Sequence, residues 1–223
     1  MRKGIYTSFA VGVCTLLMGC AASYKSLNTE SIPYIKDNSS AANVFVEYHH
    51  NVLAEARNKK YHKREINKGI QLVALKITNN TETDLEYNRN FQLYNGQTVI
   101  NVLPVNTVHS QLKQQSPLYL LYLLLSFMNV TTSSTTTTGS TINSSDVHVY
   151  PIGLVVGPAI ALGNLAVASS ANKKFEAEMI GHSIFNRVIK KGETAYFIIG
   201  VNSTMFQPIS LKLNNSNSQA VVN

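Results

Sequence analysis

Hydrophobic and polar residues alternate with a period of two in several segments of the chain, and this alternation predicts β-strands. The clearest case is the segment 70–78, where Val73, Leu75 and Ile77 share one face and Lys76 lies on the other. The segment 43–48 alternates more weakly and could supply a first strand. This part of the chain is therefore predicted to be β-structure.

Turn signals accompany these strands. Residues 79–81, Asn-Asn-Thr, are predicted to end the strand as a turn. The segment 91–100 alternates on both sides of Asn95-Gly96, which predicts a β-hairpin because both central residues must tolerate positive φ. Near the C-terminus, 194–201 is apolar on both faces, as expected for a strand between two layers, and 209–213 alternates again.

Across 105–186 the alternation stops and helical patterns replace it. A short polar helix is predicted over 106–115, with Val108 and Leu112 on one side. The segment 118–127 behind it is apolar on almost every face, and such a helix must be buried in protein or in lipid.

A second apolar segment, 152–168, carries small residues four apart, and this spacing lets two helix backbones approach closely. Together with 118–127 it predicts a helical hairpin. Three uses of the hairpin remain open: it completes the core of the domain, it dips into a membrane leaflet, or it docks into a membrane complex. The residues expected to contact a membrane or a partner are Leu118, Leu121, Leu124, Phe127, Gly153, Gly157 and Ala161.

The segments around the hairpin are predicted from their composition. The Ser/Thr tract 131–145 has little to bury and is predicted to be a flexible connector. Pro158 is expected to start or kink a helix, which would break the second apolar segment. A separate amphipathic helix is predicted over 173–185, and its inward-facing residues are Phe175, Met179 and Ile180.

Two polar segments precede the first long strand. Residues 21–42 are rich in Ser, Asn and small residues, and they are predicted to be a tether. Residues 57–68 are strongly basic, which suits either a patch for lipid phosphates or a solvated loop between strands. We favour the loop, because no amphipathic stripe accompanies the charges.

The N-terminal segment 1–20 has a basic start, a short apolar run and small residues at its end, as is typical of a secretory signal peptide. The run is shorter than the ~20 residues that a transmembrane anchor needs. Its last four residues, Leu17-Met18-Gly19-Cys20, resemble the lipobox of bacterial lipoproteins. The resemblance implies cleavage after Gly19, diacylation of the Cys20 thiol and acylation of the new amine. Because Ala21 rather than Asp follows, it also implies an outer-membrane destination.

Composition narrows the possible partners. The chain has 223 residues, of which 14% are charged, and its formal net charge is +7. This mild surplus of positive charge does not indicate nucleic-acid binding. Of its two cysteines, Cys14 would leave with the signal and Cys20 would carry lipid, so no disulfide or cysteine metal site is expected. The expected partners are the membrane, through the lipid at Cys20, and an envelope protein. We expect no cofactor and no metal.

Three segments resemble a known family. Residues 73–81, 91–96 and 189–201 are similar to the immunoglobulin-like domains of bacterial surface lipoproteins, which join a "strand, Asn-Asn, strand" half to a "Gly-Glu-Thr, strand" half. The resemblance implies a mainly β fold, an immunoglobulin-like β-sandwich that carries the apolar helical hairpin as an α insertion. It covers about half of the mature chain and implies no catalytic role.

The sequence offers only weak signals for catalytic or metal-binding residues. His49 and His50 would point to opposite faces of a strand, so they would not bind one metal ion together. Ser170 and Lys173 match the S-x-x-K pair of penicillin-binding enzymes, but the companion motifs are missing. The sequence therefore predicts no catalytic residue and no metal site.

These patterns predict a lipid-anchored structural or interaction protein of the cell envelope, docked through its helical insertion. The alternatives are a periplasmic or surface carrier of a hydrophobic ligand and, less favoured, a hydrolase. The predicted segments are a signal peptide (1–19), a lipidated tether (20–42), a sandwich (43–213) with its insertion at about 105–186, and a disordered tail (214–223).

Overall fold

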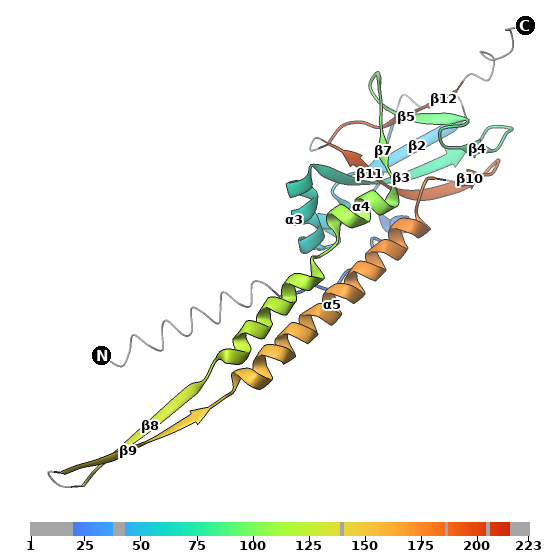
Figure 1. Cartoon of the computed structure of the whole chain (residues 1–223). Coiled ribbons are helices and arrows are strands. Elements are labelled where there is room, and N and C mark those ends of the chain that lie inside the picture. Colours follow the sequence, from blue (N-terminus) through green and yellow to red (C-terminus); the bar gives the residue numbers. More distant parts are fainter. Residues whose placement is uncertain (1–19, 38–42, 139–140, 186, 204–205, 215–223) are drawn as a thin grey trace, which may run out of the picture. The chain divides into compact units, whose positions relative to one another are not determined.

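The computed structural model describes residues 20–37, 43–138, 141–185, 187–203 and 206–214. The predicted signal peptide, with Gly19, and the tail after Asn214 lie outside the described residues. The chain divides into two compact units: a sheet unit (Tyr24–Lys113 and Ala171–Asn223) and a hairpin unit (Met1–Ser23 and Gln114–Ser170). The fold is mixed α and β, with several antiparallel sheets and one long helix (Figure 1).

A five-stranded antiparallel sheet with the order β1-β2-β3-β11-β7 forms the middle of the sheet unit. Its strands are β1 (Ile35–Lys36), β2 (Val44–His49), β3 (Ile70–Asn79), β7 (Val102–Leu103) and β11 (Thr194–Asn202). β3 and β11 pair along their whole length, from Thr194 opposite Thr78 to Asn202 opposite Ile70. The strand predicted over 70–78 is therefore confirmed, and Leu75 is fully buried.

Two smaller sheets share a core with one face of this central sheet. One has the order β12-β5-β6, with β5 (Phe91–Asn95), β6 (Thr98–Val99) and β12 (Ser210–Leu213), and the other pairs β10 (Val188–Ile189) with β4 (Leu85–Glu86). In this first core, Val73, Leu75 and Ile77 of β3 pack with Phe91 and Leu211 of the smaller sheet. The alternation of β3 therefore marks the face that another sheet covers.

The predicted hairpin at Asn95-Gly96 forms between β5 and β6, but its turn is shifted by one residue. Asn95 still pairs with Thr98, so Gly96 and Gln97 make the turn. Gly96 has φ +58 and supplies the positive φ by itself.

Helices cover the opposite face of the central sheet. They are η1 (Thr29–Ser31), α2 (Val52–Glu55), α3 (Lys59–Lys68), α4 (Val105–Leu112) and the C-terminal part of α5 (Gly153–Gly181). In this second core, Leu72 and Ala74 of β3 pack with Tyr61, Phe175 and Met179. β3 is buried on both faces for this reason. The predicted helix with Val108 and Leu112 on one side is confirmed as α4, and both side chains are fully buried.

The basic segment 57–68 contains helix α3 and is not the solvated loop that we favoured. Its buried side is small: Tyr61 and Glu65, four residues apart, are buried, and the other positions are mostly basic or polar. One aromatic residue and one carboxylate do not make a recognisable apolar stripe, so the sequence pattern missed the helix.

In the described part of the predicted tether, residues 21–37, the chain is not free, because it enters the second core. Tyr24 and Leu27 are buried. The Tyr24 ring contacts Tyr61 and Phe175, and its hydroxyl donates a 2.5 Å hydrogen bond to Glu178 Oε2. Isolated apolar residues in a polar segment have no periodicity, so nothing local marked them as core.

α5 runs without a break from Gly153 to Gly181, so the predicted interruption at Pro158 and the separate helix over 173–185 are both wrong. Phe175 and Met179 are buried as predicted, but Ile180 is 61% exposed. Successive residues of a helix point about 100° apart, so Ile180 cannot share the inward direction of Met179.

The hairpin unit consists of a 3₁₀ helix, η2 (Ser116–Phe127), the N-terminal part of α5, and the strands β8 (Val130–Thr138) and β9 (Thr141–Tyr150) between them. β8 and β9 pair from Val130 opposite Tyr150 to Thr138 opposite Thr141, and we call this pair the ribbon. The predicted flexible connector over 131–145 is therefore wrong. The unit begins at Gln114 rather than at 105, because α4 packs in the second core.

Candidate functional site

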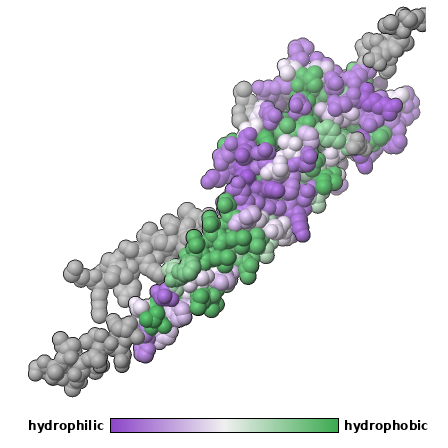
Figure 2. All heavy atoms as spheres, in the orientation of Figure 1, coloured by the Kyte–Doolittle hydropathy of each residue, from purple (hydrophilic) through white to green (hydrophobic). Residues whose placement is uncertain are grey.

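The hairpin unit presents a large hydrophobic surface, the candidate site. On η2, Leu118, Leu121, Leu124 and Phe127 are 55%, 62%, 65% and 82% exposed. On α5, Leu154, Val155 and Leu162 are exposed to a similar degree. Figure 2 shows hydrophobic residues gathered over these helices. Contiguous apolar surfaces of this kind mark sites of interaction with a protein or a membrane.

Gly153, Gly157 and Ala161 lie inside the hairpin and not on this surface. All three are buried. A Cβ atom added at Gly157 would lie 2.8 Å from the Ser126 amide nitrogen, and one added at Gly153 would lie 2.3 Å from the Leu125 carbonyl oxygen. The spacing of small residues thus allows η2 and α5 to approach closely. These three residues pack inside the hairpin, and their contact with a membrane or a partner stays a prediction.

Polar side chains of the hairpin unit bind the chain directly after Cys20. The Ala21 amide donates a 2.6 Å hydrogen bond to Asn164 Oδ1 on α5. The Ala22 amide donates to Gln114 Oε1 at 3.1 Å, and Gln114 Nε2 donates back to the Ala22 carbonyl oxygen at 2.6 Å. Cys20, whose thiol is free and half-buried, is therefore fastened beside the start of η2.

Sequence analysis did not identify Gln114 or Asn164. A usable signal was present, because Asn164 is the one amide side chain in the apolar segment 152–168. An isolated polar residue in such a segment needs a hydrogen-bond partner. The partner, Ala21, is far away in the sequence, so it could not be named without the fold.

Among the described residues, one helix, α5, is long and apolar enough to cross a membrane, by length and composition alone. Most of its apolar stretch is not buried within the protein. A core helix of the same length would be mostly buried, so packing against the rest of the described chain does not account for this stretch.

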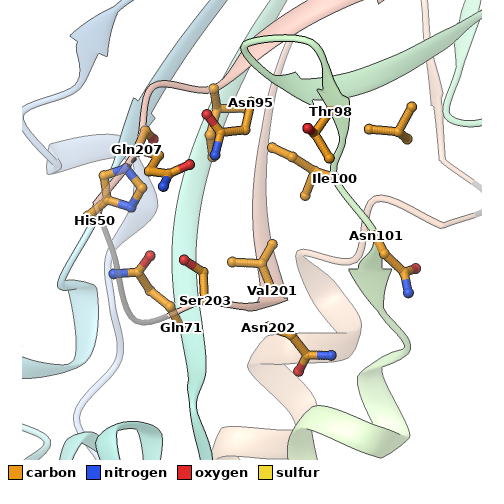
Figure 3. Close-up of a pocket in the computed structure, with 12 residues that line it drawn as sticks. His50, Gln71, Asn95, Thr98, Ile100, Asn101, Val201, Asn202, Ser203 and Gln207 are labelled. Carbon is orange, nitrogen blue, oxygen red and sulfur yellow. Dashed lines mark hydrogen bonds between the residues drawn. The ribbon is translucent and has the colours of Figure 1, made fainter.

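The sheet unit has a cavity of about 440 Å³, lined by His50, Gln71, Asn95, Thr98, Asn101 and Gln207 among others (Figure 3). His50 Nε2 donates to the Gln207 carbonyl oxygen at 2.9 Å, and burial lowers the pKa of His50. No Asp, Glu, Lys or Arg is among the described residues that line the cavity. These lining residues therefore provide no pair of charged groups for acid–base chemistry.

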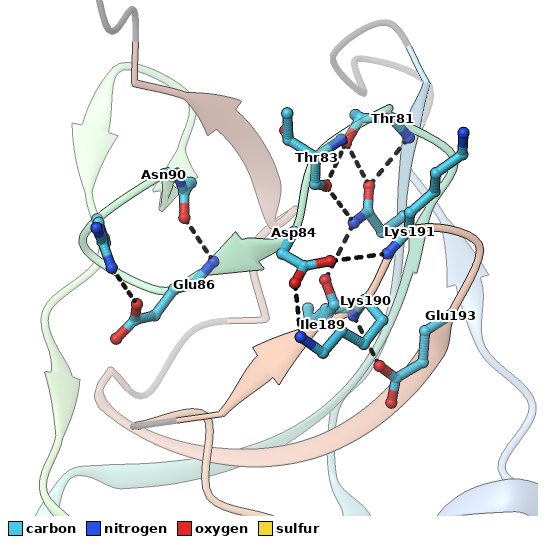
Figure 4. A network of polar contacts seen from close by, with 11 residues as sticks. Thr81, Thr83, Asp84, Glu86, Asn90, Ile189, Lys190, Lys191 and Glu193 are labelled. Atoms are coloured by element: carbon cyan, nitrogen blue, oxygen red, sulfur yellow. Dashed lines mark hydrogen bonds and ion pairs between the residues drawn. The ribbon is translucent and has the colours of Figure 1, made fainter.

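A network of polar contacts joins the segments 79–86 and 189–193 of the sheet unit (Figure 4). Lys190 Nζ donates to Asp84 Oδ2 at 2.6 Å, and the Lys190 amide donates to Glu193 Oε2 at 2.7 Å. The Lys190 ammonium lowers the pKa of the Asp84 carboxyl. These residues connect strand ends, so we assign the network to structure.

The structure also shows the surroundings of possible metal ligands and of the adjacent residues His49 and His50. Among the described residues, no cluster of three or more His, Cys, Asp and Glu side chains could hold a metal ion. His49 lies 2.9 Å from the Pro33 carbonyl oxygen and 2.8 Å from Glu55 Oε2, whereas His50 contacts Gln207. The two adjacent imidazoles thus have separate partners.

Comparison with protein-family models, curated proteins and solved structures finds no match to this chain.

Proposed function

We propose that this protein is a bacterial lipoprotein of the cell envelope, anchored through acyl chains on Cys20 and docked in the membrane through its hairpin unit. The observation that carries the proposal is the fastening of Ala21 and Ala22 to Asn164 and Gln114. Acyl chains on Cys20 would leave the chain beside the exposed apolar surface of the hairpin. Lipid and hairpin would then enter the same membrane.

The energetics favour this arrangement. Two or three acyl chains bind a membrane stably, since each buried methylene contributes about 0.8 kcal/mol. Exposed leucines such as Leu121 and Leu124 would be transferred from water into hydrocarbon at the same place, at about 25 cal/mol per Å² of apolar area. The anchor also holds the hairpin at the membrane, so the second contact forms without a new diffusional encounter.

The proposal extends to the fold and the location. The sheet unit would be an immunoglobulin-like sandwich, supported by the first core that the central sheet shares with the smaller sheets. Outer-membrane sorting is supported by Ala21 after the lipobox cysteine. The role is structural or one of interaction, and it involves no catalytic step.

The test isolates the hairpin from the lipid. A chain without residues 1–19 and with Cys20→Ser is neither exported nor acylated, and its binding to phosphatidylethanolamine/phosphatidylglycerol liposomes is measured by flotation. We expect this protein to float with the liposomes and the variant Leu124→Lys/Val155→Lys to remain at the bottom, because both residues are well exposed on the hairpin. The matched control is Ile66→Lys on α3, where Ile66 is 62% exposed, and it should float. Equal flotation of all three proteins, or of none, would contradict the proposal.

A further inference from the structure

We infer that the hairpin of η2 and α5 crosses the whole bilayer, so that the ribbon lies in water on the opposite side from the two ends of the hairpin, next to Lys113 and Lys173. The inference rests on the proposed membrane docking and adds its topology. Four observations lead to it: the distribution of apolar residues around α5, the lengths of the helices, the placement of charges and the character of the ribbon.

Apolar residues surround α5 on all sides within the hairpin unit. Leu154, Val155 and Val156, three successive residues, are 64%, 73% and 43% exposed, and together they point in directions that span about 200° of the helix circumference. A helix that lies flat on a membrane has one polar face toward water. α5 has no such face here, so it suits immersion in hydrocarbon rather than a position at the interface.

The lengths of the helices match a bilayer. The part of α5 that belongs to the hairpin unit, 153–170, has 18 residues and rises about 27 Å at 1.5 Å per residue, close to the usual hydrocarbon thickness of about 30 Å. η2 has 12 residues and rises about 24 Å because a 3₁₀ helix advances about 2.0 Å per residue. An α-helix of the same 12 residues would rise only about 18 Å at 1.5 Å per residue. The bacterial outer membrane is thinner than average, so both helices are long enough for it.

Charged residues bracket the hairpin. Lys113 precedes it, Lys173 and Lys174 follow it, and Asp146 in the ribbon is the one Asp, Glu, Lys or Arg residue between Lys113 and Lys173. Lysines at the ends of a span place their ammonium groups at the interface. At the other end, Tyr150 closes the ribbon and is 52% exposed, as is typical of aromatic residues at the second interface.

The ribbon decides between crossing the bilayer and dipping into it. β8 and β9 pair with each other and with no other described strand, so their outer edges leave backbone groups for water. An open strand edge does not occur in hydrocarbon, because each unsatisfied peptide group costs several kcal/mol there. A hairpin that entered one leaflet would place the ribbon in the middle of the bilayer. A hairpin that crosses both leaflets places it in water.

The experiment labels single cysteines in intact cells with a maleimide that cannot cross membranes. With Cys14 cleaved off and Cys20 acylated, the mature chain would have no other thiol. Three variants are compared: Thr132→Cys in the ribbon, Lys63→Cys on α3, and Val155→Cys in the hairpin. All three residues are exposed in the protein.

We expect Thr132→Cys and Lys63→Cys to react under opposite conditions, one in intact cells and the other only after the outer membrane is permeabilised. Val155→Cys should react only in detergent. If Thr132→Cys and Lys63→Cys react under the same condition while Val155→Cys stays protected, the hairpin is inserted without crossing, and this inference is wrong. If Val155→Cys reacts without detergent, the proposed docking fails as well.

Discussion

The Gly192 amide donates a 2.6 Å hydrogen bond to the carbonyl oxygen of Asn79, and the Asn79 amide donates a 2.9 Å bond to the neighbouring Glu193 carbonyl oxygen. These bonds join the end of β3 to the turn before β11. They also bring together the Asn-Asn and Gly-Glu-Thr segments on which the family resemblance rests. The two halves of the sheet unit, separated in sequence by the hairpin unit, are closed at this point.

Asn79 should be essential for this closure. Its side chain is fully buried, and its Nδ2 donates to the carbonyl oxygens of Thr83 and Ile189 at 2.9 and 3.1 Å. Asn79→Ala leaves the Ile189 oxygen without this donor, so we expect a loss of about 1–3 kcal/mol in urea unfolding. The control Asn80→Ala, at an exposed position, should change stability by less than about 0.5 kcal/mol. Equal effects of the two variants would contradict this role.

Leu75 should be a main contributor to the first core. It is fully buried among residues of both the central and the smaller sheets. Leu75→Ala should cost about 2–5 kcal/mol, which could unfold a domain of ordinary stability. Phe45→Ala, at a side chain that is 52% exposed on the adjacent strand, should cost less and serves as the control. An unchanged melting temperature for Leu75→Ala would show that this face of β3 is not core.

Gly157 should be needed for close packing of η2 on α5. A larger side chain meets the Ser126 main chain and forces the helices apart. In liposomes, we expect the amides of η2 to exchange hydrogen faster in Gly157→Ile than in the parent protein. Gly163→Ala is the matched control, because a Cβ at Gly163 meets nothing within 4 Å. Faster exchange in both variants would indicate a general effect of the substitutions rather than lost helix contact.

Glu65 should make stability depend on pH. Its Oε1 accepts a 2.6 Å hydrogen bond from the Leu72 amide, and its Oε2 lies 2.9 Å from His62 Nδ1, but burial still raises the pKa of Glu65. The folded state therefore binds the proton more tightly than the unfolded state. Protonation of Glu65 therefore stabilises the folded state. This stabilisation is complete at pH values below the pKa of Glu65 in the unfolded state, and it is lost as pH rises through the pKa of Glu65 in the folded state.

Glu65→Gln removes this titration and keeps an amide oxygen for the Leu72 N–H. We expect the variant to gain stability relative to the parent as pH rises from 4 toward 7, measured by urea unfolding at each pH. Glu30→Gln removes the same charge at an exposed site and should show no such trend. A difference between Glu65→Gln and the parent that stays constant with pH would contradict the assignment.

Cys20 should carry lipid. Cys20→Ala is expected to remain an uncleaved precursor and to incorporate no labelled fatty acid, because thiol acylation precedes cleavage in the lipoprotein pathway that the lipobox implies. The parent protein provides the comparison for both gel mobility and labelling. Normal processing of Cys20→Ala, with unchanged membrane association, would refute the lipobox interpretation.

The sequence by itself determined those features that depend on neighbouring residues. The alternation at Val73, Leu75 and Ile77 identified a buried strand face, and the spacing of Val108 and Leu112 identified the inner side of α4. Gly153 and Gly157 indicated two closely packed helices. In each case the geometry of one helix or strand converts local spacing into a shared direction, so no distant partner had to be known.

Only the tertiary structure decided features that depend on distant partners. Glu65 is buried because the Leu72 amide binds it, and Tyr24 belongs to the second core because Tyr61 and Phe175 surround it. Asn164 and Gln114 fasten the chain after Cys20, although nothing next to them in the sequence points to residues 21 and 22. Such contacts form between segments that the fold brings together, and a pattern within one segment does not specify its partner.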